Sequence, residues 1–294
     1  MMTSVPTPLE PDVQLNSNSL VSPAAQLTPA EYSAVRDFLE GQAGIRLGEG
    51  KEYLVTSRLG RLVGELKLES FSALCEALKS PGGQQVKTAV VDAMTTNETF
   101  WFRDPSHYLA LTRDVLGKQA PQRVRIWSAA SSTGQEVYSI AISLQEAKRE
   151  LALPANFQYE ILGTDISPTA LAQAKTARYC GVSASRGLTD EQRHRYFKVE
   201  GDCLEVLPQY RASLQWREFN LMKPFELLGR FDVIFCRNVL IYFSPERKRD
   251  IVERFARALN PGGILILGST ESMSDHGDLF EMQSSQGALI YRKR

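Results

Sequence analysis

Residues 125–136 read Arg-Ile-Trp-Ser-Ala-Ala-Ser-Ser-Thr-Gly-Gln-Glu. An apolar run from Val124 to Ala129 predicts a buried strand, and a helix-length segment begins at Gln135. Small residues between the two elements let the backbone approach a ligand closely. Gly134 is the only glycine in this turn, so the turn lacks the G-x-G-x-x-G pattern of a dinucleotide site. Taken alone, these residues fit a ligand-binding turn and a plain strand-to-helix turn equally well.

Short apolar runs alternate with helix-length segments from here to the C-terminus. The predicted strands are 124–129, 159–163, 214–219, 231–236 and 264–267, and the predicted helices are 135–150, 168–177 and 245–259. This alternation predicts an α/β fold with a parallel sheet and helices on both faces. Residues 288–292 have no helix before them, so we expect them to pair antiparallel at the end of the sheet.

One segment departs from this alternation. Thr189 begins a short helix, and residues 195–199 and 204–207 resemble two short strands around Gly201-Asp202. We therefore expect a small β insertion at 188–215.

The chain before this α/β part predicts helices only. Thr28-Pro29-Ala30-Glu31 is a capping-box sequence with proline at the first helical position. Helices are expected at 29–42, 49–66, 70–80 and 84–95. We assign 28–95 to a small all-helical domain and 96–294 to the α/β domain. Residues 1–27, rich in Pro, Ser, Thr and Asn, are expected to form a disordered tail.

The composition argues against several classes of protein. The 294 residues suggest two domains, and 34 Lys+Arg balance 34 Asp+Glu, which argues against a nucleic-acid binder. The four cysteines form no C-x-x-C pair and the three histidines are isolated, so we expect neither a metal site nor a disulfide framework. There is no apolar run of about 18 residues, and we expect no signal sequence. We expect a cytoplasmic monomer that does not insert into a membrane.

Polar residues follow two of the predicted strands. Asp165 comes after 159–163, where an acidic residue can hold a ribose diol. The alternative is that Asp165, or Ser167 beside it, caps the next helix. Arg237 and Asn238 follow 231–236, where they could bind a ligand or simply end the strand.

Longer motifs make a more specific case. They are MTTNETFWFR at 94–103, the segment 125–136, Thr164-Asp165-Ile166, and FDVIFCRNVLIYF at 231–243. With these motifs in this order, the chain resembles the CheR family of chemotaxis receptor methyltransferases from about residue 28 to residue 292. The family often has glutamate and proline where this chain has Gln135 and Val137, but Glu136 is retained.

The resemblance implies a Rossmann-like methyltransferase sheet that uses S-adenosylmethionine and releases S-adenosylhomocysteine, without a metal. It implies that the acceptors are glutamate side chains in the cytoplasmic helical bundle of chemoreceptors, whose methyl esters serve adaptation in chemosensory signalling. The implied cofactor residues are Asn97, Thr99, Arg103, Glu136, Asp165, Asn220, Leu221, Arg237 and Asn238. Two alternatives remain open: a non-catalytic signalling module that binds these compounds, and a methyltransferase for another protein substrate.

The implied reaction needs positioning more than acid–base chemistry, because a glutamate carboxylate is already ionised at neutral pH. Arg103 is the candidate to hold the acceptor carboxylate, since a guanidinium binds carboxylates bidentately. Its alternative role is an ion pair with Asp104 in solvent. Tyr242 could place its hydroxyl at the acceptor oxygen, or could be a buried tyrosine with a satisfied hydroxyl.

Receptor docking is expected on the second predicted helix, which the family uses in a similar way. Lys51, Arg58 and Arg61 fall near one side of it and could meet acidic receptor residues. A solvated charged face is the alternative. Some family members bind a receptor pentapeptide on the β insertion. The short connection at 200–203 argues against that here, and titration with a receptor-tail peptide tests it.

Overall fold

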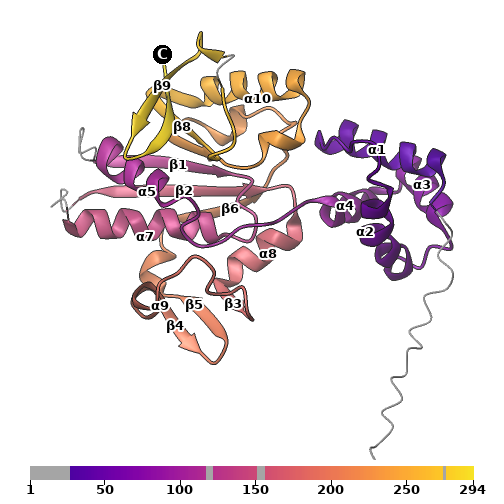
Figure 1. Cartoon of the computed structure of the whole chain (residues 1–294), viewed down its shortest axis with the longest axis horizontal. Helices are drawn as coiled ribbons and strands as arrows, with labels where there is room; N and C mark the ends of the chain where they lie inside the picture. Colours follow the sequence, from indigo (N-terminus) through magenta and orange to yellow (C-terminus); the bar gives the residue numbers. More distant parts are fainter. Residues whose placement is uncertain (1–26, 117–121, 151–155, 274–275) are drawn as a thin grey trace, which may run out of the picture.

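The computed structural model describes residues 27–116, 122–150, 156–273 and 276–294 (Figure 1). Apart from Leu27, the tail expected at 1–27 lies outside the described residues. None of the helices in these ranges is long and apolar enough to cross a membrane.

Between residues 27 and 95 the structure has four helices: α1 (Pro29–Ala43), α2 (Glu52–Glu65), α3 (Phe71–Lys79) and α4 (Gln84–Met94). The predicted capping box is confirmed, because Thr28 Oγ1 accepts from the Glu31 N–H while the Glu31 carboxylate accepts from the Thr28 N–H. Apolar residues from all four helices form a core of their own. The predicted all-helical domain is therefore present.

The main sheet has seven strands in the order β6-β2-β1-β7-β8-β10-β9. The strands are β1 (Arg123–Ala129), β2 (Gln158–Asp165), β6 (Leu214–Glu218), β7 (Phe231–Cys236), β8 (Leu259–Leu267), β9 (Phe280–Ser285) and β10 (Ala288–Lys293). The first five in the sheet order are parallel, and β10 pairs antiparallel with β8. The parallel sheet and the antiparallel pairing are thus confirmed, but β10 does not lie at the end of the sheet, because β9 pairs on its other side. β9 was not predicted, because this edge strand carries few apolar residues.

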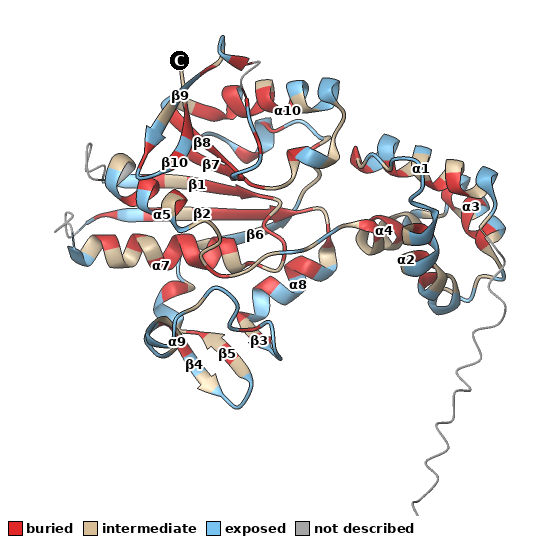
Figure 2. Cartoon of the chain, in the orientation of Figure 1, coloured by how far each residue is buried: buried red, intermediate tan, exposed pale blue. Residues whose placement is uncertain are grey.

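Helices cover both faces of the sheet (Figures 1 and 2). α5 (Pro105–Ala110) and α7 (Gln135–Glu150) pack on the face that carries Ile126, whereas α10 (Pro245–Ala258) packs on the face that carries Trp127. The other helical elements of the described residues are η1 (Leu111–Leu116), α8 (Pro168–Thr176), α9 (Asp190–Tyr196), η2 (Pro208–Tyr210), η3 (Glu226–Leu228) and η4 (Leu240–Tyr242). Neighbouring strand residues point to opposite faces, and burial of both faces explains the nearly continuous apolar runs.

A second, three-stranded sheet has the order β3-β5-β4, with β3 (Arg178–Cys180), β4 (Phe197–Glu200) and β5 (Cys203–Val206). β4 and β5 are the two short strands predicted in the insertion. β3 lies ahead of residue 188, so the small sheet includes a segment that the sequence had placed outside it. Three residues are too few to give a strand pattern.

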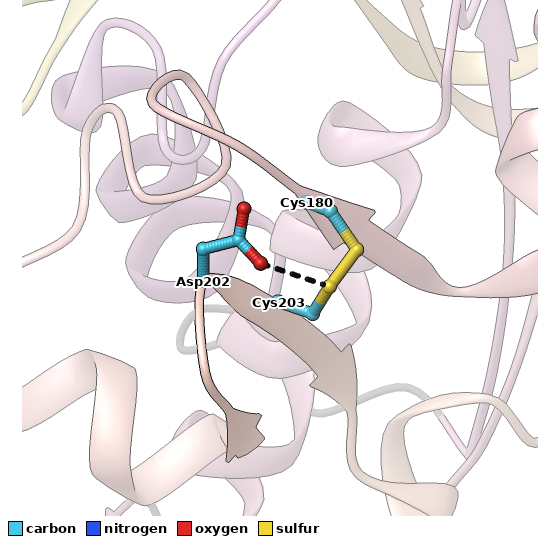
Figure 3. A group of neighbouring side chains, drawn as sticks. All are labelled: Cys180, Asp202 and Cys203. Carbon is cyan, nitrogen blue, oxygen red and sulfur yellow. Dashed lines mark hydrogen bonds between the residues drawn. A yellow bond between two sulfur atoms is a disulfide. The ribbon is translucent and has the colours of Figure 1, made fainter.

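The expectation of no disulfide is wrong for one pair of cysteines. Cys180 and Cys203 lie opposite each other in the β3–β5 register and are joined by a disulfide, with Asp202 beside them (Figure 3). These three residues are near enough together to suggest a metal site, but the two sulfur atoms are bonded to each other. The pairing depends on strand register across 23 residues, which no local cysteine spacing announces.

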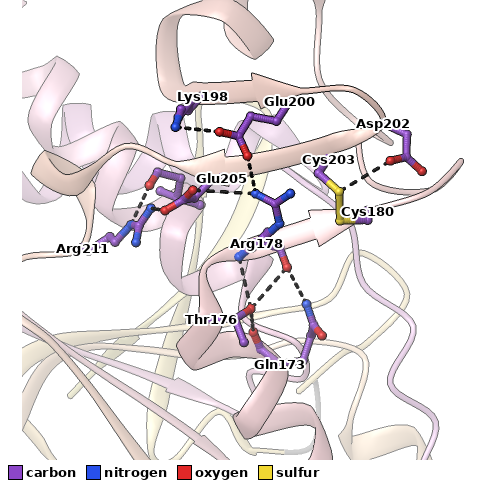
Figure 4. A network of polar contacts seen from close by, with 11 residues as sticks. Gln173, Thr176, Arg178, Cys180, Lys198, Glu200, Asp202, Cys203, Glu205 and Arg211 are labelled. Carbon is purple, nitrogen blue, oxygen red and sulfur yellow. Dashed lines mark hydrogen bonds and ion pairs between the residues drawn. A yellow bond between two sulfur atoms is a disulfide. The ribbon is translucent and has the colours of Figure 1, made fainter.

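The small sheet is also held by charged side chains, so it does not rest on the disulfide alone (Figure 4). Arg178 on β3 and Lys198 on β4 both contact the Glu200 carboxylate, at 2.7 and 2.6 Å. These two contacts lower the pKa of Glu200 to about 2, through hydrogen bonds first from Lys198 and then from Arg178. Arg211 closes the network on Glu205 at 2.7 Å.

Candidate functional site

A cavity of about 910 Å³ lies between the helical domain and the carboxyl ends of the parallel strands. Its wall comprises residues of the helical domain, the segment 94–104 that joins the two domains, and the loops after β1, β2, β6, β7 and β8. Such an edge is where ligands bind in doubly wound sheets. All nine expected cofactor residues line it, as do Tyr242 and Lys51.

The turn after β1 is shaped to bring its backbone close to this cavity. Ala130, Ser132 and Gly134 all have positive φ. A side chain at Gly134 would put its Cβ 2.8 Å from Ala174 Cβ, so glycine is required there. The hydroxyl of Ser131 is buried and has no hydrogen-bond partner among the described residues. This free polar atom on the cavity wall favours a ligand-binding turn over a plain one.

Asp165 holds this turn. Its buried carboxylate accepts from the N–H groups of Ser132 at 2.7 Å and Ser167 at 2.9 Å. Burial raises the pKa of Asp165, and the hydrogen bonds from Ser167 and Ser132 oppose that rise. Ser167, not Asp165, caps α8, because its hydroxyl accepts from the Ala170 N–H.

Arg237 lies at the centre of a buried ion cluster beside the cavity. Its guanidinium contacts Glu136 at 3.1 Å and Asp104 at 2.6 Å, and it also donates to the carbonyl of Arg103. Glu136 additionally accepts from the Ser128 hydroxyl at 2.7 Å. The charges of Arg237 and Glu136 therefore stabilise each other and fix the wall of the cavity.

Arg103 is placed differently. Its guanidinium makes one long contact, 3.5 Å, to the carbonyl of Glu98 and lies 5.5 Å from the centre of the Phe100 ring. The alternative pairing with Asp104 is wrong, because Asp104 pairs with Arg237. Among the described residues Arg103 has no carboxylate partner, so the cavity contains an uncompensated cation.

Tyr242 is half-buried on the cavity wall, and its hydroxyl makes no hydrogen bond to a described residue. The alternative of a buried tyrosine with a satisfied hydroxyl is therefore wrong. Its backbone carbonyl accepts from the Arg46 N–H at 2.9 Å, which ties η4 to the helical domain. The hydroxyl is free to meet a ligand.

Two other expected cofactor residues hold neighbouring segments. Asn220 donates to the carbonyl of Gln42 in α1 at 2.8 Å, and the carbonyl of Asn97 accepts from the Ser132 hydroxyl at 2.8 Å. Thr99 is half-buried and Leu221 is buried. The Asn220–Gln42 contact joins the two domains, and the Asn97–Ser132 contact fixes the connecting segment 94–104 to the turn after β1.

The three expected docking residues have different environments. Arg58 donates to the carbonyls of Met94 and Thr95, both at 2.9 Å, so its guanidinium is committed to the segment after α4. Arg61 pairs with Glu65 at 2.6 Å and its side chain is 85% exposed. Lys51 is exposed at the cavity.

Two acidic residues that hold segments next to the cavity were not predicted from the sequence. Asp92 on α4 accepts from the hydroxyls of Ser167 and Thr169, which links the helical domain to the start of α8. Glu271 accepts backbone N–H groups from the loops after β7 and β8. Glu271 had a signal of the same kind as Asp165, since it follows the end of a parallel strand.

Two family models together match most of the chain. Residues 30–95 match the model described as CheR methyltransferase, all-alpha domain, and residues 97–289 match CheR methyltransferase, SAM binding domain. The boundary between these matches falls within the segment that joins the two domains at the cavity.

Curated relatives agree with the family models. Chemotaxis protein methyltransferase 1 of Vibrio cholerae is 42% identical, covering 92% of this chain and 98% of that protein. Chemotaxis protein methyltransferase Cher2 of Pseudomonas putida is 39% identical, and chemotaxis protein methyltransferase 1 of Pseudomonas aeruginosa is 40% identical; each covers 90% of this chain and 98% of the relative. The chain belongs to the CheR methyltransferase family, and it is a chemotaxis methyltransferase with an S-adenosylmethionine-binding domain.

Proposed function

We propose that this protein transfers the methyl group of S-adenosylmethionine to glutamate side chains in the cytoplasmic helical bundle of chemoreceptors. The products are glutamate methyl esters and S-adenosylhomocysteine. The observation that carries the proposal is Arg103, an arginine without a carboxylate partner among the described residues, in a cavity lined by every expected cofactor residue. A cation placed in this way can receive the carboxylates of cofactor and acceptor. The protein then acts in the cytoplasm, as a monomer and without a receptor-tail tether.

The cavity fits the cofactor. Its volume of about 910 Å³ lies in the range of small-molecule sites. Ser131 Oγ and Asn238 Oδ1 are buried on its wall without partners among the described residues. Buried polar atoms are normally hydrogen-bonded, so these two atoms suit polar groups of a bound molecule.

When bound, the cofactor supplies a methyl group on a sulfonium, which is already activated for displacement. The acceptor is ionised at neutral pH, since a glutamate side chain has a pKa of about 4.3 in water. No residue of the protein has to remove a proton. Arg103 orients the acceptor carboxylate, and the free hydroxyl of Tyr242 donates to an acceptor oxygen.

A methylation assay tests the proposal. Purified protein is incubated with radiolabelled methyl donor and cytoplasmic fragments of chemoreceptors, and base-labile label on the fragments is measured. Release of labelled methanol in base is expected for a carboxyl ester. Binding of S-adenosylhomocysteine without transfer would indicate the non-catalytic module instead, and base-stable label would indicate another acceptor group.

Asp165 provides a prediction on cofactor binding. Asp165→Ala removes the acceptor for the N–H groups of Ser132 and Ser167, which loosens the turn after β1. We expect the affinity for S-adenosylhomocysteine, measured by calorimetry, to fall by about tenfold. Asp165→Asn keeps one acceptor oxygen, so its affinity for S-adenosylhomocysteine should fall less. Unchanged affinity in the alanine variant would show that Asp165 serves only the local fold.

Arg61 provides a prediction on receptor docking. We propose docking through Lys51 and Arg61, and not through Arg58, whose donors are occupied. Arg61→Glu should raise KM for a receptor fragment about fivefold while kcat is unchanged, and the difference should shrink at high salt. Lys79→Glu on α3 is the matched control, because Lys79 is also exposed and pairs with a glutamate one turn away. Equal KM values for both variants would count against docking at Arg61.

A further inference from the structure

Glu271 occupies an unusual position for a carboxylate. It follows the end of β8, is buried, and accepts three backbone hydrogen bonds. Its Oε2 accepts from the N–H groups of Asn238 at 2.7 Å and Gly268 at 2.9 Å, and its Oε1 accepts from the Val239 N–H at 3.1 Å. Hydrogen bonds to an ionised acceptor are stronger than those between neutral groups. One side chain thus ties the carboxyl ends of the adjacent strands β7 and β8 together.

The residue that Glu271 fixes most closely is Asn238. Asn238 has a φ of 59°, in the left-handed region that costs a non-glycine residue conformational energy. Its side-chain Oδ1 is buried on the cavity wall and has no partner among the described residues. A strained residue whose polar atom is free in a cavity needs its neighbours to hold it.

Gly268 constrains Asn238 from the other side. A Cβ at position 268 would lie 2.7 Å from Asn238 Nδ2 and 2.9 Å from its backbone nitrogen. Only glycine leaves Asn238 where it is. The Glu271 carboxylate and the bare backbone of Gly268 therefore constrain the same residue.

We propose that Glu271 is a positioning residue for the cofactor. Its carboxylate fixes the backbone of Asn238, so that Asn238 Oδ1 is ready to accept a hydrogen bond from an N–H or O–H group of S-adenosylmethionine. The inference rests on the proposed function, since it concerns how that cofactor is held. Glu271 itself has no role in the transfer of the methyl group.

Two variants test this role through the same residue. Glu271→Gln keeps the shape of the side chain but replaces one acceptor oxygen with an amide nitrogen, which donates and cannot accept from an N–H. Gly268→Ala leaves Glu271 in place and displaces Asn238. For each variant we expect the affinity for S-adenosylhomocysteine, measured by calorimetry on the folded protein, to fall by about tenfold. KM for the methyl donor should rise by a similar factor, with a smaller change in kcat.

Asp232→Asn is the matched control. Asp232 lies at the opposite end of β7, where its carboxylate accepts from the Arg125 N–H and from Asn260 Nδ2, both at 2.8 Å. Its replacement should lower the melting temperature without changing cofactor affinity. If Glu271 only stabilised the fold, Glu271→Gln would likewise lower the melting temperature and leave cofactor affinity unchanged.

A double variant shows whether Glu271 acts through Asn238. Glu271→Gln combined with Asn238→Ala should bind no more weakly than Asn238→Ala alone. The proposal would be overturned if the affinity losses of the two single variants added up in the double variant. It would also be overturned if Glu271→Gln bound the cofactor as tightly as Asp232→Asn. Gly268→Ala carries the same test if the glutamine variant fails to fold. Failure of the unmodified protein to bind S-adenosylhomocysteine would instead reject the proposed function.

Discussion

Arg103→Ala is expected to lower kcat/KM for receptor methylation by about a thousandfold, the scale seen when an electrostatic contact to the reacting groups is removed. In the described part of the chain no carboxylate is paired with this guanidinium, and its one hydrogen bond, to the carbonyl of Glu98, is long. In the proposed mechanism its removal costs little folding energy but leaves the acceptor carboxylate without a cation. The melting temperature should stay within a few degrees of that of the unmodified protein.

Arg186 offers a matched control for Arg103. Both guanidiniums lie over the ring of Phe100, at 4.5 Å for Arg186, but Arg186 pairs with Glu98 and is not part of the cavity wall. Arg186→Ala should retain near-normal methylation. Arg103→Lys should recover part of the activity, because it restores the charge without the bidentate geometry. Near-normal turnover of Arg103→Ala would remove Arg103 from the proposed mechanism.

The elements of the fold were predictable where their signals are local. The capping box at Thr28 predicted the start of α1, and Ser167 was one of two candidate caps for α8; both Thr28 and Ser167 do cap these helices. The two strands that were not predicted, β3 and β9, lack a clear sequence pattern. β3 has three residues, and β9 lies at the edge of the sheet, where half of its residues are exposed.

The position of the site could be predicted from the fold. The hydrogen-bond and ion-pair partners of its residues could not. Parallel strands end at one edge, so polar residues after β2 and β7 were expected to meet there, and Asp165 and Asn238 do line one cavity. Whether an arginine at this edge meets a ligand or a carboxylate depends on contacts across long separations. Arg237 pairs with Asp104 across 133 residues, and Arg58 reaches Met94 across 36.

The second large expected effect is a loss of folding stability when Arg237 is replaced. Arg237→Met is expected to lower the free energy of unfolding by about 3–5 kcal/mol, because it leaves Glu136 and Asp104 without their cation. The side chain of Arg237 is only 2% exposed, and that of Glu136 is 11% exposed, so water can replace little of the lost contact at Glu136. Chemical denaturation followed by circular dichroism measures the change.

The exposed pair Arg249–Glu253 on α10 serves as the control. Its side chains are 60% and 40% exposed, and Arg249→Met should cost less than about 1 kcal/mol. A triple variant, Arg237→Met with Glu136→Gln and Asp104→Asn, should regain part of the lost stability, since it leaves no unpaired charge. A loss at Arg237 no larger than that at Arg249 would mean that the cluster does not stabilise the cavity wall. Arg237 would then be free to serve a ligand directly.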